Sequence, residues 1–306
     1  MPPSPNQRGA ALMTSAMAGF ACSDACMKML GETLPLFQAL LLRGCGTTLG
    51  LWTLAFAAGQ VRLDLGARSW ALIGARAVAE MGAAWFFITA LFQMPLANVS
   101  AILQSLPLAV TLAGWLVLGE PAGRQRLLAI LVGFGGVLLI VRPGAEGFGL
   151  PALYALASVG CVTVRDLIAR RIPAATPSLL VAAVTAAAVA AFGGVGSLFV
   201  DWGPVDGGTV LLILAATGFV MVAYVGSVAA MRVGELGFVA PFRYMSLLVS
   251  LLLGAAVFGT FPDAVTLLGA GIVVATGLFT LWRERVVGQR AARAARLEEE
   301  VPPGAT

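Results

Sequence analysis

Charged side chains inside otherwise apolar segments are the residues of this chain best suited to chemistry. Arg76 and Glu80 stand four positions apart, so on a helix they share a face and can pair. A charge within the hydrocarbon of a bilayer costs about 2.5–3.5 kcal/mol on insertion scales, so each one needs a reason to be there. Two interpretations stay open: the two residues bind or gate a charged ligand beside a pathway, or they form a structural ion pair.

Aromatic and amide side chains extend this candidate site. Trp85 and Phe86 follow Glu80 by about one to two helical turns and can stack on a planar ligand or pack against lipid and core. Gln104 precedes Pro107, which can bend a helix. An amide without a partner in lipid is costly, so Gln104 is expected to face protein or, as we favour, a cavity.

Arg243 stands in the segment APFRY, where Pro241 removes a backbone donor. Its planar guanidinium suits a carboxylate or a phosphate; the alternative is an arginine that reaches the membrane surface. Tyr244 and Tyr224 offer hydroxyl groups with aromatic faces, or they only pack. The candidate substrate-binding residues are therefore Arg76, Glu80, Trp85, Gln104, Tyr224, Arg243 and Tyr244.

The acid-x-x-x-base pair Asp24 and Lys28 matches the pair Asp166 and Arg170, 142 positions later. Each pair can form on one helix face, and we name these residues as candidates for coupling or gating. The alternative is that each pair anchors the topology of its helix. Asp24 is also a candidate for proton coupling, whereas Arg43 is interpreted as a structural contact between helices.

Composition shows what must position these residues. Of the 306 residues, 59% are hydrophobic and 11% charged, against about 45–50% and 25% in soluble domains. The mean hydropathy of +0.93 excludes an ordinary soluble enzyme and a disordered chain. The chain contains no histidine, which excludes most imidazole chemistry. The four cysteines lie within apolar segments, and neither a disulfide nor a metal site nor a cofactor is expected.

Ten runs are long and apolar enough to span a bilayer, which takes about 20 residues. The sequence therefore predicts an all-α membrane protein. The first run carries charge and has no cleavage pattern, so we interpret it as a retained span. The predicted spans are residues 10–30, 34–57, 70–92, 97–118, 126–142, 149–169, 177–199, 208–230, 237–258 and 264–282.

Basic residues set the orientation of the spans. With the N-terminus in the cytoplasm, 14 of the 19 Lys and Arg residues, Arg165 among them, fall on the cytoplasmic side. The opposite side holds Lys28 and Arg142 with three aspartates, Asp201, Asp206 and Asp263. The sequence thus predicts cytoplasmic N- and C-termini. The basic pI of about 9.2 follows from this topology and does not indicate a nucleic-acid partner.

The chain repeats itself at an offset of about 140–142 residues, which predicts two five-helix units at 10–142 and 149–282, followed by a cytoplasmic Arg/Glu-rich tail at 283–306. Five spans per unit is odd, so the second unit must be inverted in the membrane, which is typical of secondary transporters. The matched pairs are Asp24/Asp166, Lys28/Arg170, Pro35/Pro177, Gly114/Gly254, Gly119/Gly259, Gly136/Gly277 and Arg142/Arg283.

Two stretches carry a family resemblance: MPLANVSAILQSLPLAVTLAGWLVLGEP at 94–121 and GFVAPFRYMSLLVSLLLGAAVFGTFPD at 237–263. With the Gly-rich spans that follow, they resemble the EamA-type transporters of the drug/metabolite transporter superfamily. The resemblance implies a central cavity lined mainly by spans 3, 4, 8 and 9. The segments SDACMK and VRDLIARR resemble most the riboflavin and S-adenosylmethionine carriers. Thr260 departs from the pattern, because the first unit has Glu120 there.

The sequence therefore predicts a secondary transporter of a small organic metabolite that works by alternating access between the two repeats. The alternatives are an exporter of amino acids or drugs, or a membrane sensor without transport. An enzyme is not expected, because no catalytic constellation is visible. The expected partners are a small-molecule substrate and membrane lipid. Eighteen arginines against one lysine point to a GC-rich bacterial genome, and so to a bacterial inner membrane. The sequence does not predict the substrate, the direction of transport or the oligomeric state.

Overall fold

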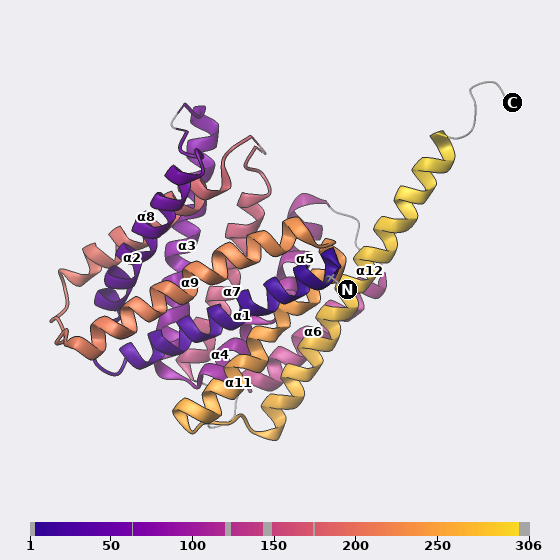
Figure 1. Cartoon of the computed structure of the whole chain (residues 1–306). Coiled ribbons are helices and arrows are strands. Elements are labelled where there is room, and N and C mark those ends of the chain that lie inside the picture. Colours follow the sequence, from indigo (N-terminus) through magenta and orange to yellow (C-terminus); the bar gives the residue numbers. More distant parts are fainter. Residues whose placement is uncertain (1–3, 63, 120–123, 143–148, 174, 300–306) are drawn as a thin grey trace, which may run out of the picture.

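The computed structural model describes the whole chain except residues 1–3, 63, 120–123, 143–148, 174 and 300–306, and the described residues form helices without strands (Figure 1). Ten spans are long and apolar enough to cross a membrane, which confirms the predicted number. The helices are α1 (Pro5–Leu30), α2 (Leu36–Ala57), α3 (Ala67–Gln93), α4 (Leu96–Leu103), α5 (Leu106–Leu118), α6 (Arg124–Val141), α7 (Leu150–Ala169), α8 (Ser178–Ser197), α9 (Gly207–Val233), α10 (Leu236–Val239), the 3-10 helix η1 (Ala240–Tyr244), α11 (Met245–Phe258) and α12 (Ala264–Glu299).

Two spans are interrupted near a proline. The fourth span consists of α4 and α5, with the break at Gln104 and Ser105. Pro107 has no N–H to bond the carbonyl four residues earlier, so α4 ends at Leu103. The ninth span begins with η1, which contains Pro241, and continues as α11. The bend expected at Pro107 is therefore present.

Gly119 and Gly259, which stand 140 positions apart, end their helices in the same way. Gly119 ends α5 and Gly259 ends α11 in the left-handed conformation, with φ of 68° and 61°. The backbone N–H of Gly119 bonds the carbonyl of Gly114, and that of Gly259 bonds the carbonyl of Gly254. A residue with a Cβ is strained at positive φ, which explains glycine at both positions.

The helices pack in five antiparallel pairs: α1 with α9, α2 with α8, α3 with α7, α4 with α11, and α6 with α12. In the pair of α2 and α8, Gly44 lies against Ala190, Gly193 against Leu41, and Gly196 against Phe37. Residues later in one helix thus meet residues earlier in the other. Glycine at these contacts lets the backbones approach closely.

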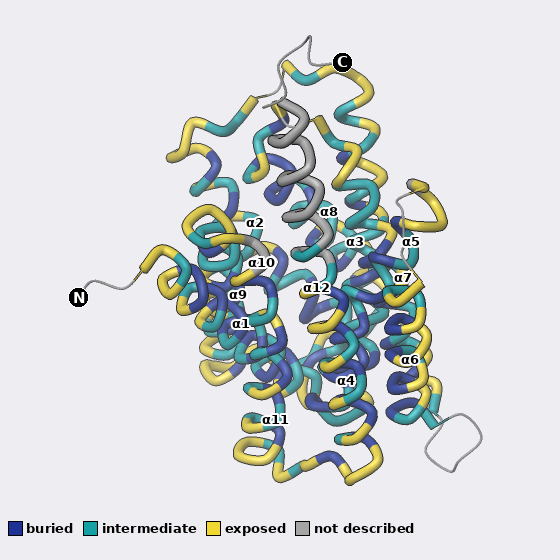
Figure 2. Tube along the Cα trace, turned by 90° about the vertical axis from the view of Figure 1, so that its right-hand side faces the viewer, coloured by how far each residue is buried: buried dark blue, intermediate teal, exposed yellow. Residues whose placement is uncertain are grey.

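Buried positions concentrate between the helices, and exposed ones face outward (Figure 2). The largest core lies where α4, α6, α7 and α12 meet and includes Val99, Ile102, Ile130, Ala155 and Val273. Phe56 and Phe199 are 80% and 81% exposed. In water such a surface would aggregate, but in a bilayer it faces lipid, whose tails are equally apolar.

An ion pair between Arg142 and Asp263 joins the C-terminal end of α6 to the N-terminal end of α12. Hydrogen bonds from Arg142 and from Thr266 hold the pKa of Asp263 well below its usual range. Arg142, one of the two basic residues predicted on the side opposite the cytoplasm, is thus paired with an acid. The helix α12 does not stop at the predicted end of the last span, residue 282, but continues to Glu299.

Candidate functional site

A chain of polar side chains crosses from α8 through α3 to α7. Arg76 on α3 donates from Nη1 to Oγ1 of Thr185 on α8 at 2.6 Å, and its Nη2 lies 3.9 Å from Oε2 of Glu80. Glu80 in turn accepts two hydrogen bonds from Nη1 of Arg165 on α7, at 3.1 and 3.2 Å. Arg165 also bonds Asp166 from Nε at 2.9 Å. We call Thr185, Arg76, Glu80, Arg165 and Asp166 the polar network.

The structure brings Arg76 and Glu80 together, as their spacing predicted, but it gives Glu80 a closer partner. Arg165 was assigned in the sequence only to the cytoplasmic charges, so sequence reasoning missed the residue at the centre of the network. The available signal was its position directly before Asp166 in a segment that the repeat had already marked. Asp166 meets Arg165 here, in place of the expected local pairing with Arg170.

Three further polar groups on other helices surround the polar network. Tyr224 on α9 lies in the electrostatic field of Arg76, Glu80 and Arg165. Arg43 on α2 interacts electrostatically with Asp24 on α1 and with Glu80. All three side chains are half-buried. Arg43 was interpreted as a structural contact between helices. Its interactions with Asp24 on α1 and with Glu80 on α3 are compatible with that role, and they also connect it to the polar network.

An aromatic cluster continues from the polar network along α3. The rings of Trp85 and Phe86 lie 4.8 Å apart, and each lies 6.0 Å from the ring of Tyr154 on α7. These separations are in the range of favourable aromatic contacts. Tyr154 was not among the predicted residues, because nothing in the sequence near it indicates that it meets α3. The three rings, tilted by 32° to 61° against one another, form an aromatic cluster between α3 and α7.

Two hydrogen bonds join the interrupted spans to each other. Gln104 donates from Nε2 to Oγ of Ser246 at 2.9 Å, and Ser100 donates to Oγ of Ser250 at 2.8 Å. Gln104 is buried and so faces protein, which was one of the two expected environments. Ser246 also donates to the carbonyl of Arg243 at 3.1 Å. The hydrogen bonds of Ser246 therefore connect the break between α4 and α5 to the end of η1.

Arg243 and Tyr244 lie on η1, apart from the polar network. The side chain of Arg243 is exposed, and that of Tyr244 is buried against Gly277 of α12. Among the described residues, the Tyr244 hydroxyl has no hydrogen-bond partner. A buried hydroxyl without a partner is unfavourable, so this position is suited to a ligand or a water.

Lys28 does not bond Asp24 as its spacing suggested. Its Nζ donates to the backbone carbonyls of Leu91 and Met94, each at 2.9 Å, and lies 5.7 Å from the centre of the Phe258 ring. The ammonium group therefore joins the end of α1 to the end of α3. The expected local pair is wrong because backbone acceptors from another helix reach the lysine.

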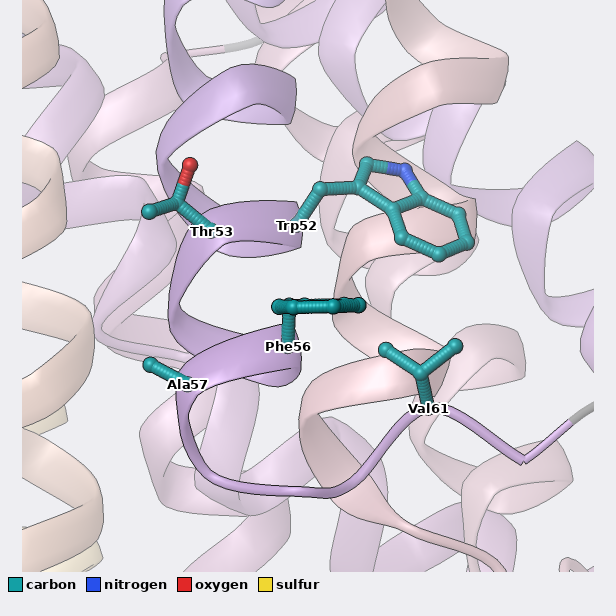
Figure 3. A pocket seen from close by; sticks show the side chains of 5 residues that line it. All are labelled: Trp52, Thr53, Phe56, Ala57 and Val61. Atoms are coloured by element: carbon teal, nitrogen blue, oxygen red, sulfur yellow. The ribbon is translucent and has the colours of Figure 1, made fainter.

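Two surface hollows lie on the outside of the bundle. One, of about 430 Å³, is formed by Trp52, Thr53, Phe56, Ala57 and Val61 at the end of α2. Figure 3 shows Trp52 and Phe56 on the same side of the helix, with Val61 beside them. The other, of about 710 Å³, lies between α6 and α12 and includes Phe279, Trp282 and Arg283. Both are mainly apolar and face outward, as expected of grooves that lipid fills.

Residues 7–142 match the model of the EamA-like transporter family. A riboflavin transporter of Vibrio cholerae is 29% identical over 204 residues, which are 66% of this chain and 67% of that protein. An S-adenosylmethionine uptake transporter of Rickettsia bellii is 25% identical over 199 residues, 62% of this chain and 65% of that protein. The chain thus aligns with about two thirds of the length of these relatives. A crystal structure with 21% identity covers 91% of this chain and 98% of its own, with a TM-score of 0.65, and supports the fold.

Proposed function

Because residues 7–142 of this chain belong to the EamA-like transporter family, we propose that this membrane transporter carries a small organic metabolite by alternating access. The two units at 10–142 and 149–282 are inverted repeats, and both termini and the tail at 283–306 lie in the cytoplasm. The membrane is a bacterial inner membrane, in agreement with the bacterial relatives.

The antiparallel pairing of the helices supports the inverted repeat. If α1 to α6 and α7 to α12 are equivalent units, the second span of one pairs with the second span of the other, as α2 and α8 do. Likewise, the first span of each unit pairs with the third span of the other, as α1 does with α9 and α7 with α3. A two-fold axis in the plane of the membrane produces this arrangement, and it places the ligand between the repeats.

The observation that carries the proposed site is the polar network between the two units. Arg76 and Glu80 belong to the first unit, whereas Arg165, Asp166 and Thr185 belong to the second. Charged groups inside a membrane protein usually line a substrate or ion pathway. Relative movement of the two units would make and break these hydrogen bonds. The polar network is therefore suited to bind a charged group of the ligand, and its bonds would differ between the two states of the transporter.

The substrate class follows from the groups that lie together. A ligand with a flat ring system would stack on Trp85, Phe86 and Tyr154, while its polar groups reach Arg76, Glu80 or Tyr224. Riboflavin and S-adenosylmethionine, which the names of the relatives mention, both combine an aromatic ring system with polar substituents. We propose import of such a compound; export of amino acids or drugs is the alternative.

Uptake into proteoliposomes tests this function. We expect saturable uptake of radiolabelled riboflavin or S-adenosylmethionine, and counterflow that distinguishes a carrier from a channel. Arg76→Ala should reduce the initial rate at least tenfold. Arg68→Ala is the matched control, because Arg68 stands on the same helix with an exposed side chain. Equal rates in the two variants would remove the polar network from the pathway, and no flux of either compound would refute the substrate class.

A further inference from the structure

Lys28 is the only lysine of the chain and joins three helices at one end of the bundle. It extends from the last turn of α1, donates to two carbonyls at the end of α3, and lies over the ring of Phe258 near the end of α11. A cation at the C-terminal end of a helix is stabilised by the negative end of the helix dipole. The ring adds a cation–π contact.

The sequence makes these carbonyls available to Lys28. Pro95 has no N–H, so it leaves the carbonyl of Leu91, four residues earlier, without its helical donor. The next helix does not use the carbonyl of Met94 either, because the N–H groups of Asn98 and Val99 both bond the carbonyl of Pro95. Lys28 therefore bonds two acceptors that the corner between α3 and α4 exposes.

The inverted repeat gives Lys28 a counterpart at the opposite end of the bundle. Arg170 stands 142 positions after Lys28. Lys28 lies in the last turn of α1, and Arg170 lies directly after the last residue of α7. The corner after α9 corresponds to the corner after α3: Gly234 bonds the carbonyl of Ala230, just as Met94 bonds that of Ala90. The two ends nevertheless differ. The helix α1 packs on α3, whereas within the described part of the chain α7 and α9 share no comparable interface.

We propose that Lys28 is a latch that holds shut the end of the transporter at which α1 terminates, and that the structure is in this latched state. When that end opens, α1 leaves α3 and Lys28 releases the two carbonyls. In the opposite state, Arg170 would bond the carbonyls at the end of α9 in the same way. This inference rests on the proposed alternating access. It assigns the contact of Lys28 with the end of α3 to one state and the contact of Arg170 with the end of α9 to the other.

The single lysine makes the latch directly measurable. A membrane-impermeant amine reagent, sulfosuccinimidyl acetate, is added to the protein in proteoliposomes, and acylation of Lys28 is followed by mass spectrometry. Detergent-denatured protein gives the fully reactive reference.

Phe258→Leu tests the latch without changing the lysine, because it removes the ring whose centre lies 5.7 Å from the ammonium group. We expect about two- to fivefold faster acylation of Lys28 in this variant, since a cation–π contact stabilises the bound position of the lysine. Gln93→Ala, at an exposed position next to Met94, should react like the wild type. Arg170→Gln weakens the opposite state and should slow the acylation.

Equal acylation rates in the wild type, Phe258→Leu and Arg170→Gln, or faster acylation in Arg170→Gln, would overturn the latch. These measurements need no substrate. The expected acylation rates without flux in the proteoliposomes would therefore count against the proposed substrate class and leave the latch in place. Flux with uniform acylation rates would do the reverse.

Discussion

Removing the guanidinium of Arg165 tests the centre of the polar network. In Arg165→Gln, Glu80 loses both of its bonds from α7, and Asp166 loses its partner as well. A hydrogen bond to a charged group contributes about 1.5–3 kcal/mol, and breaking a fully buried ion pair costs about 3–5 kcal/mol. Because the side chains of Arg165 and Glu80 are 24% and 26% exposed, partial screening applies. We expect a loss of about 2–3 kcal/mol in the free energy of unfolding.

A double-mutant cycle separates this pair from its neighbour. Glu80→Gln is combined once with Arg165→Gln and once with Arg76→Gln. The Arg165–Glu80 contact is a hydrogen-bonded pair at 3.1 Å, whereas the Arg76–Glu80 contact at 3.9 Å is too long for a hydrogen bond. The coupling energy should therefore be about 1–2 kcal/mol for the first pair and below about 0.5 kcal/mol for the second.

Thermal unfolding in detergent, followed with a thiol-reactive dye on the native cysteines, provides the assay. A loss of about 2–3 kcal/mol corresponds to a decrease in melting temperature of about 3–5 °C in a protein of this size. The Arg68→Gln variant on α3 is the control and should unfold like the wild type. Coupling that is equal for the two pairs, or larger for Arg76 with Glu80, would refute the assignment of Arg165 as the main partner.

Three further outcomes are expected from thermal unfolding. Gly193→Ala should lower stability by about 1–3 kcal/mol, because its Cβ would lie 2.6 Å from the backbone nitrogen of Leu41, whereas the neighbouring Gly194→Ala, 3.4 Å from a side chain, should change little. Gly259→Ala should cost about 1 kcal/mol because its φ is 61°, and Gly271→Ala, with open space around it, is the control. Asp263 has a lowered pKa, so its pairing stabilises the folded state above the unfolded-chain pKa of about 3.9 and is lost as the pH falls below it. Asp263→Asn should therefore lower the melting temperature at neutral pH and make the melting temperature depend less on pH in the acid range. An unchanged pH dependence of the melting temperature in the acid range would contradict the assignment.

Hydropathy and proline were sufficient to predict the ten spans and the bend at Pro107. The ten spans follow from runs of apolar residues, because a bilayer leaves a chain no other way to satisfy its backbone groups. The bend at Pro107 follows equally from local chemistry, since a missing N–H acts on the residue four positions earlier. Both features depend on short stretches of sequence, and the ten spans are confirmed by the helices of the structure.

The partners of the charged residues could not be predicted in the same way. Spacing identified the acids and bases that can share a helix face, and Arg76 with Glu80 is such a pair. For Lys28 and Asp166, however, another partner replaced the local one. Lys28 donates to the carbonyls of Leu91 and Met94, and Asp166 accepts from the adjacent Arg165. A local ion pair on an exposed helix contributes only about 0.3–0.5 kcal/mol, so any well-placed tertiary or adjacent partner can outcompete it.

The two corners of the bundle show the same limit of local reasoning. Pro95 follows the corner residue Met94, whereas Glu235 follows Gly234 and does carry an N–H group. That N–H group nevertheless does not return to the carbonyl of Met231, because it bonds Oδ1 of Asn6 at the start of α1. A missing N–H at Pro95 and an N–H bonded elsewhere at Glu235 therefore have the same effect on the helix that ends there. What distinguishes the corner after α3 is a tertiary contact, the lysine of α1 that bonds the carbonyls of Leu91 and Met94.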